Sequence, residues 1–284
     1  MINIFLFQAL GDNLISLSIL EQLDREVKIV GTKHTKNIIN LMDTEKSSDI
    51  KILFEDIPAF YDIKKQGIKN AITDFFKFIK YINDNKINEL ILEKKDFRSK
   101  LLSYFTKAKI YTPNILNRNV YKNRIEIISQ IYNQDLHFQN YNLQLNNSKI
   151  IIMNPLTREL FRNINTNHLE YILNILKKQD YIIYLIDFEH KYKEFSNKVS
   201  FYLTNTTLFD MKNLLNKCDL YIGGDSFLIH LAYYLKRNYF MVFYRDNDDF
   251  LPPNITNDFY IKAHDSIDFE AEISYKFKKI GINK

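Results

Sequence analysis

The first residues that could do chemistry follow a short apolar run at the beginning of the chain. Residues 2–7 have the length and composition of a strand, and Ala9-Leu10-Gly11-Asp12-Asn13 comes directly after them. Gly11 would permit a tight turn from strand to helix, and Asp12 would then stand where the helix starts. An aspartate at that place is a favoured N-cap, so capping is the simpler interpretation. The functional interpretation is a carboxylate that accepts a proton from a hydroxyl group of a bound molecule.

A second group of such residues lies near the end of the chain. An apolar strand, 220–222, runs into Gly223-Gly224, which is followed by Asp225-Ser226 and a predicted helix. The paired glycines would let the backbone turn sharply and approach a ligand closely, and the free N–H groups of the helix start favour an anion. His230 lies one helical turn further along, on the same face as the serine. A lone histidine is more often packed or capping than catalytic, so both interpretations of His230 stay open.

Charged and polar residues also follow a third strand, predicted at 149–153. The strand ends at Asn154, and Thr157, Arg158 and Arg162 follow before the next predicted helix. The planar guanidinium group of arginine pairs well with phosphate oxygens. A solvated loop explains the same residues equally well.

Acidic residues follow a fourth strand, predicted at 181–186, in the run Asp187-Phe188-Glu189. An acid at a strand end in a Rossmann-like unit commonly accepts hydrogen bonds from ribose hydroxyls, while an acid that complements a helix dipole is the alternative. The acidic run 246–249 could suggest a metal site with oxygen ligands. Because Pro252-Pro253 marks this region as a loop, we interpret the run as solvated. We expect no metal ion and no cofactor.

The composition limits the class of protein. The chain has 284 residues, of which 46% are hydrophobic and 26% charged, as in an ordinary globular protein. The net charge of +5 is mildly basic, but no dense stripe of Lys and Arg with interleaved aromatic residues predicts nucleic-acid binding. The single cysteine, Cys218, allows no disulfide within the chain, and we predict that it is a small buried hydrophobe. The sequence has no apolar stretch of membrane-spanning length and no basic signal-peptide leader.

The elements that must position these residues alternate between strand and helix. Strand patterns begin at residue 2 and recur up to 109–111, and a helix at 120–132 closes the first half. The polar segment 135–148 is interpreted as a linker, after which the alternation restarts and continues to a strand at 239–243. Within this second half, a charged helix is predicted from His190, after the strand at 181–186. Alternation of this kind makes parallel sheets with helices on both faces. We predict an α/β protein with two Rossmann-like domains, 1–145 and 146–284, which face each other across a cleft that holds the chemistry.

The succession of these motifs resembles glycosyltransferase family 9, the ADP-heptose:lipopolysaccharide heptosyltransferases and their relatives. Gly11-Asp12 with the apolar helix after it is similar to the family's N-terminal signature. The segment 90–110, which contains Phe97-Arg98-Ser99, is similar to its strand, Arg-Ser helix and following strand. Arg162 falls where the family carries a basic residue, and the segment 224–232 resembles its C-terminal Asp-Ser/Thr and His-Leu-Ala motifs. The departures are Leu156 where the family often has Gly, Arg162 in place of Lys, and Asn165 in place of Pro.

The resemblance implies a GT-B architecture and an inverting, metal-independent transfer. A sugar, heptose or similar, would move from a nucleotide-diphosphate donor such as ADP-heptose to a lipopolysaccharide or other surface-glycan acceptor. Asp12 would be the general base, Arg162 would neutralise the leaving diphosphate with help from Arg158, and Glu189 would hold the ribose. The implied donor-binding residues are Asn154, Thr157, Arg158, Arg162, Glu189, Gly224, Asp225, Ser226 and His230. The implied acceptor-binding residues are Gly11, Asn13 and Arg98.

The resemblance also implies where each partner binds and where the protein works. Domain 1–145 would bind the acceptor, and domain 146–284 would bind the nucleotide sugar. We expect a bacterial, cytoplasmic protein with peripheral contact to the cytoplasmic face of the inner membrane. The departures from the family motifs leave an alternative open, namely a catalytically inactive GT-B-like binding or assembly protein of the same glycan pathway. A Rossmann oxidoreductase is disfavoured because no GxGxxG run follows any predicted strand.

Overall fold

The chain folds into two compact units, Met1–Phe138 and Gln139–Lys284. The structure is a computed structural model that describes residues 2–24, 26–42, 50–92, 95–112, 119–138, 145, 148–244, 248–253, 255–263 and 268–282. The predicted domain boundary at 145/146 and much of the predicted linker 135–148 lie beside or outside the described residues. Residues 246 and 247 of the acidic run also lie outside them.

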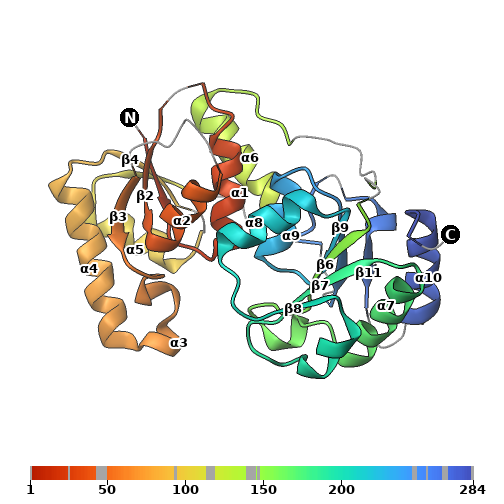
Figure 1. The fold of residues 1–284 in the computed structure, drawn as a ribbon. Coiled ribbons are helices and arrows are strands. Elements are labelled where there is room, and N and C mark those ends of the chain that lie inside the picture. Colours follow the sequence, from red (N-terminus) through yellow and green to blue (C-terminus); the bar gives the residue numbers. More distant parts are fainter. Residues whose placement is uncertain are drawn as a thin grey trace. The chain divides into compact units, whose positions relative to one another are not determined.

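The first unit is an α/β fold around a parallel sheet, drawn in Figure 1. Its described strands have the order β3-β2-β1-β4-β5. The strands are β1 (Asn3–Leu6), β2 (Lys28–Thr32), β3 (Ile50–Phe54), β4 (Glu89–Leu92) and β5 (Lys109–Tyr111). The helices are α1 (Leu10–Leu20), α2 (Lys33–Leu41), the short η1 (Ala59–Tyr61), α3 (Ile63–Gln66), α4 (Ile68–Asp84), α5 (Phe97–Phe105) and α6 (Val120–Tyr132).

Helices cover both faces of this sheet. Figure 1 shows α4 along one side of the strands and α1 and α6 along the other. Phe5 and Phe7, alternate residues of the first strand and the turn after it, pack in one core cluster with Phe78 of α4 and Leu102 of α5. Helices α4 and α5 therefore share one face of the sheet. The alternation of strand side chains between the two faces dictates this arrangement.

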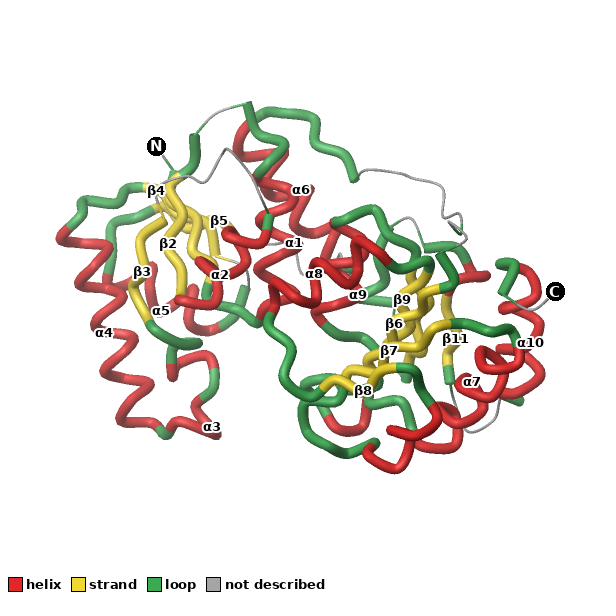
Figure 2. Tube along the Cα trace, in the orientation of Figure 1, coloured by secondary structure: helices red, strands yellow, loops and turns green. Residues whose placement is uncertain are grey.

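The second unit repeats the plan with a larger parallel sheet. Its described strands have the order β11-β10-β9-β6-β7-β8. Figure 2 shows α7 and α10 on one side of the strands and α8 and α9 on the other. The strands are β6 (Ile150–Asn154), β7 (Ile182–Ile186), β8 (Phe201–Leu203), β9 (Leu220–Gly223), β10 (Tyr239–Phe243) and β11 (Tyr260–Lys262). The helices are η2 (Leu160–Arg162), α7 (Thr166–Lys178), η3 (Lys193–Lys198), α8 (Leu208–Lys217), α9 (Phe227–Tyr234), η4 (Asn257–Phe259) and α10 (Phe269–Lys279).

Each sheet has one place where the chain reverses its direction across the strands. In the first unit the chain moves outward from β1 to β3 and then returns to β4 beside β1. In the second unit it moves outward from β6 to β8 and then returns to β9 beside β6. The loops after two such neighbouring strands diverge and leave room for a ligand at the carboxyl ends of the strands. The expected ligand-binding loops are therefore those after β1 and β4 in the first unit and after β6 and β9 in the second.

The second unit corrects one sequence prediction directly after β7. A charged helix was predicted from His190, but only the short η3 forms, and the additional strand β8 follows it. His190 has a left-handed backbone with φ of 56°, and the carboxylate of Asp187 accepts hydrogen bonds from the backbone N–H groups of Lys191 and Tyr192. These bonds satisfy the backbone in a turn and remove the need for a helix.

Candidate functional site

An arginine–aspartate ion pair lies at the reversal point of the second sheet. Arg162, in the loop after β6, places its Nη1 atom 2.8 Å from Oδ2 of Asp225, in the loop after β9. The two side chains are 13% and 4% exposed. The Nε group of Arg162 is buried without a hydrogen-bond acceptor among the described residues, and Nη2 lies 4.0 Å from the Glu159 carboxylate. One edge of the guanidinium group is therefore bound to Asp225, while the other N–H groups lack a close acceptor.

The loop after β6 is held in shape by its own polar side chains. The side-chain oxygen Oδ1 of Asn154 accepts a hydrogen bond from the backbone N–H of Leu156 at 2.9 Å. The backbone N–H of Thr157 donates to the side-chain oxygen of Asn163 at 2.7 Å, and the Thr157 hydroxyl donates to the backbone oxygen of Glu159 at 2.7 Å. Asn154 and Thr157 are buried, so they organise the loop that carries Arg162. Asn163 was missed from the sequence because nothing in its spacing distinguishes it from the many other asparagines.

The paired glycines after β9 pack closely against other parts of the same unit. Neither Gly223 nor Gly224 has a positive φ, and the space beside them is filled by this chain. A Cβ atom on Gly224 would lie 2.7 Å from Cγ2 of Thr157 and 3.1 Å from the backbone oxygen of Arg162. Gly224 is thus required for the close packing of two loops, and its approach to a ligand stays a prediction.

This packing predicts the effect of adding a methyl group at Gly224. We expect Gly224→Ala to lower the free energy of unfolding by about 1–3 kcal/mol, as overpacking does, and to displace the arginine loop. Adding Thr157→Ser, which removes the clashing Cγ2 atom but retains the hydroxyl, should recover part of the loss. Urea unfolding of both variants and of the serine variant alone measures this. An alanine variant as stable as the unaltered protein would contradict the packing argument.

The start of α9 brings backbone N–H groups to the same loop. Ser226 occupies the N-cap position, but its side chain makes no capping bond, and its Oγ atom is buried. His230 is a buried residue of α9. Beneath Gly223, burial raises the pKa of the Tyr221 hydroxyl. The four predicted residues Gly224, Asp225, Ser226 and His230 are thus all part of one loop and helix start beside Arg162.

Two other predicted donor residues lie at the surface of this unit. Arg158 is exposed in the loop after β6. Glu189 is exposed in the loop after β7 and forms an ion pair with Lys191. Asp187, two residues earlier, is fully buried and accepts a hydrogen bond from the Tyr202 hydroxyl at 2.7 Å. Burial and this bond raise the pKa of Tyr202 to about 12. Between the two acids, only Glu189 is accessible to a ligand.

In the first unit, Asp12 lies in the first turn of α1, at the reversal point of that sheet. The N-cap of α1 is Ala9, without a side-chain cap bond, so the interpretation of Asp12 as an N-cap is wrong. Asp12 is partly exposed, and no hydrogen bond or ion pair joins its carboxylate to another described residue. Gly11 has a helical backbone inside α1, which corrects the expectation that it forms the turn. A carboxylate in this position is available to a ligand.

Two predicted acceptor-binding side chains make hydrogen bonds within the first unit. Asn13 is fully buried, and its amide donates to the backbone oxygen of Gln8 and to Oγ1 of Thr35, each at 3.2 Å. Arg98 donates to the Asp96 carboxylate and to the backbone oxygen of Phe60. Both residues support the loops around Asp12 and η1. Asn13 has no side-chain atom accessible to a ligand, whereas Arg98 is partly exposed and its part in acceptor binding stays a prediction. The sequence could not show the burial of Asn13 because asparagine is usually exposed.

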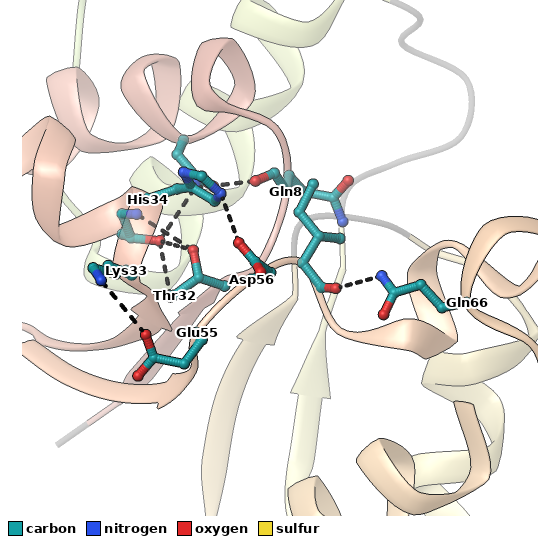
Figure 3. Close-up of polar contacts among 10 residues, drawn as sticks. Gln8, Thr32, Lys33, His34, Glu55, Asp56 and Gln66 are labelled. Atoms are coloured by element: carbon teal, nitrogen blue, oxygen red, sulfur yellow. Dashed lines mark hydrogen bonds and ion pairs between the residues drawn. The ribbon is translucent and has the colours of Figure 1, made fainter. Parts of the chain in front are cut away.

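Polar residues that the sequence had not singled out gather at the carboxyl edge of the first sheet (Figure 3). His34 Nε2 lies 3.1 Å from Oδ1 of Asp56, and Lys33 forms a longer ion pair with Glu55. Gln8, directly after β1, is buried and its Nε2 atom has no acceptor among the described residues. These residues could have been found from their positions in the sequence, because all of them follow the ends of β1, β2 and β3.

Metal-binding and membrane-spanning features were also sought in the described ranges. No group of three or more His, Cys, Asp and Glu side chains is placed there to hold a metal ion. None of the described helices combines the length and the apolar character needed to cross a bilayer. Cys218 is buried, as predicted, and burial raises the pKa of its thiol to about 12.

Comparison with known proteins finds similarity in structure only. No protein-family model matches the chain, and no curated protein matches it in sequence. The structure of E. coli heptosyltransferase WaaC with ADP is similar with a TM-score of 0.69 at 12% identity, over 99% of this chain and 100% of that one. A glycosyl transferase of family 9 from Veillonella parvula DSM 2008 is similar with a TM-score of 0.65 at 15% identity, over 98% and 89%.

The same fold also occurs in an enzyme of a different class. UDP-GlcNAc 2-epimerase from Neisseria meningitidis, in a structure bound to UDP-GlcNAc, is similar with a TM-score of 0.53 at 12% identity, over 98% of this chain and 91% of that one. At these identities the comparisons show the fold. The chain has the GT-B fold with two Rossmann-like domains, and the resemblance to glycosyltransferase family 9 is confirmed at this level.

Proposed function

We propose that this protein is an inverting, metal-independent glycosyltransferase. It moves a sugar, heptose or similar, from a nucleotide-diphosphate donor to a lipopolysaccharide or other surface-glycan acceptor. The observation that carries the proposal is the contact between Arg162 and Asp225, 2.8 Å apart at the reversal point of the second sheet. Two charged residues that are 63 positions apart in the sequence meet where a fold of this kind binds its ligand.

The second unit is assigned to the donor. As a nucleoside diphosphate leaves, negative charge develops on its phosphate oxygens, and fixed positive charge with oriented N–H groups stabilises it. Arg162 supplies the charge, and Asp225 fixes the orientation of its guanidinium group. The start of α9 supplies backbone N–H groups and the positive end of a helix dipole. Glu189 is exposed and would accept hydrogen bonds from the ribose, while Arg158 would assist with the diphosphate.

The first unit is assigned to the acceptor, with Asp12 as the general base. The acceptor hydroxyl attacks the anomeric carbon from the side opposite the leaving group, so the carbon–oxygen bond to the diphosphate breaks as the new glycosidic bond forms. The hydroxyl proton passes to the Asp12 carboxylate, which has no described partner that would compete for it.

The proposed partners follow from the same chemistry. Two of the similar structures hold ADP or UDP-GlcNAc, which supports a nucleotide-sugar donor for this fold. An acceptor that is lipid-linked would bring the enzyme to the cytoplasmic face of a bacterial inner membrane, as a peripheral protein. No metal ion is needed in this scheme because Arg162 and the helix start take over the neutralisation of the diphosphate.

A ligand screen followed by a turnover assay tests the proposal. Thermal unfolding is measured with ADP, UDP, GDP and the corresponding nucleotide sugars, and transfer or hydrolysis is then measured with each compound that stabilises the protein. We expect one diphosphate and its sugar nucleotide to raise the melting temperature, and that sugar nucleotide to be turned over without added metal. Binding without turnover would favour the inactive assembly protein, and conversion of the free nucleotide sugar into an epimer would favour the epimerase class.

A further inference from the structure

Large hydrophobic side chains are exposed on only one side of the first unit. Within the described part of that unit, every exposed large hydrophobic residue lies on α3, α4 or α5. Helices α1, α2 and α6, which cover the opposite face of the sheet, have none. Scattered exposed hydrophobic residues are normal in a monomeric protein, but a gathering on one face marks an interaction surface.

The exposed residues form stripes along the two longer helices. On α4, Ile68, Ile72 and Phe76 recur at every fourth position and are 70%, 52% and 54% exposed. On α5, Leu101 and Phe105 have the same spacing. Residues four apart lie on one side of a helix. Each helix therefore presents an apolar stripe to solvent in addition to the one that it buries.

Contacts between the two helices join these stripes into one surface. The rings of Phe76 and Phe105 meet edge to face at a centroid distance of 6.0 Å, and Phe75 and Phe105 at 6.4 Å. The Asn83 amide reaches the backbone oxygen of Phe105 at 3.5 Å. Tyr104, at 84% exposure, projects from the same end of α5. We call the exposed side chains of α3, α4 and α5 the apolar–basic face.

Positive charge surrounds the apolar stripes. Helices α3, α4 and α5 carry seven basic side chains and two acidic ones, Asp74 and Asp84. Both acids are already engaged, since Asp74 accepts a hydrogen bond from the backbone N–H of Ala59 and Asp84 pairs with Lys80. Lys64, Lys69 and Lys100 are exposed and form no ion pair with a described residue. Asp62 and Asp96, the N-caps of α3 and α5, pair with Lys65 and Arg98, so an excess of three positive charges remains over the helices and their N-caps.

We propose that the apolar–basic face docks the protein on a bilayer that contains anionic phospholipids. Apolar side chains on a basic amphipathic surface enter the boundary between headgroups and acyl chains, while the lysines remain among the anionic headgroups. Tyrosine suits that boundary because its ring is apolar and its hydroxyl is polar. A second copy of the chain fits this face poorly, since it would bring two sets of unpaired lysines together.

The inference makes the peripheral membrane contact of the proposed function more specific. It rests on the proposed function only for the assignment to a bacterial inner membrane. The apolar–basic face contains none of the residues assigned to donor binding or proton transfer. Docking through it would hold the first unit, which is assigned to the acceptor, at the surface where a lipid-linked acceptor resides. Vesicle binding and nucleotide binding are separate measurements, so either proposal can fail alone.

Flotation of the full chain with vesicles tests the proposal. We expect binding to phosphatidylcholine vesicles that contain phosphatidylglycerol and little binding to phosphatidylcholine alone. The triple variant Lys64→Gln, Lys69→Gln, Lys100→Gln should lower the partition coefficient about a hundredfold, because each lysine near such a surface contributes about fivefold. The double variant Ile72→Gln, Tyr104→Gln should lower it about tenfold through lost apolar burial.

Matched variants of the second unit control for nonspecific effects. Lys177→Gln, Lys178→Gln and Lys217→Gln remove three exposed helical lysines, and Phe209→Gln with Tyr275→Gln removes two exposed aromatic side chains. Neither set should change vesicle binding, and all variants should retain the melting temperature and nucleotide binding of the unaltered protein. Equal binding to neutral vesicles, no binding to either kind, or equal losses in the control variants would overturn the proposal. Self-association that the double variant abolishes, without vesicle binding, would assign the face to a second copy instead.

Discussion

Replacing Asp12 with asparagine is expected to lower the rate of sugar transfer about a thousandfold, within the range that a positioned general base contributes. Asparagine keeps the size of the side chain and cannot accept the hydroxyl proton. Because Asp12 neither caps α1 nor pairs with another described residue, the fold should not depend on its charge. The turnover number of the variant is measured beside its melting temperature and its affinity for the nucleoside diphosphate.

The effect should appear in turnover alone. Asp12 belongs to the first unit, while the donor is assigned to the second, so diphosphate affinity should stay within about twofold of the original, a negligible change in free energy. Glu26→Gln is a suitable control because it removes another exposed carboxylate of the same unit. Near-normal turnover in Asp12→Asn would remove the assignment of the base. An equal loss in Glu26→Gln would indicate a general effect of charge.

Replacing Arg162 with glutamine is expected to weaken binding of the nucleoside diphosphate about a hundredfold, since a fixed charge on phosphate oxygens is lost. The same change should lower the free energy of unfolding by about 3 kcal/mol, because it leaves the buried Asp225 carboxylate without its cation. Titration calorimetry measures the first effect, and urea unfolding measures the second. Arg158→Gln, an exposed residue of the same loop, should change stability little and affinity less than tenfold.

A double variant separates the two roles of Arg162. With Asp225→Asn added to Arg162→Gln, the buried charge is gone and the two amides can hydrogen-bond, so most of the stability should return. The affinity for the diphosphate should stay low because no positive charge has been restored. Recovery of both properties together would mean that Arg162 acts only through the fold. Unchanged affinity in the single variant would remove the residue from the donor site.

The sequence alone predicted the class of fold because the physical signal was local. Strand and helix periodicities alternate along the chain, and each half repeats the pattern, so two parallel sheets with helices on both faces follow directly. Cys218 was predicted to be buried and is. Short elements were harder to predict, since the turn at Asp187 and the strand β8 depend on hydrogen bonds to a buried carboxylate. Such bonds leave no periodic pattern in the sequence.

At the candidate site, the sequence determined which residues stand at the ends of strands, because the chain places them there within a few positions. Only the tertiary structure decided which of them meet. Arg162 and Asp225 form one pair because β6 and β9 are neighbours in the sheet, whereas the side chain of Asn13 is buried and bonded to Gln8 and Thr35. The side chain of Thr157 lies so close to position 224, at the same reversal point, that only glycine fits there. Contacts between residues far apart in the chain follow from strand order and packing. The spacing of residues along the chain determines neither strand order nor packing.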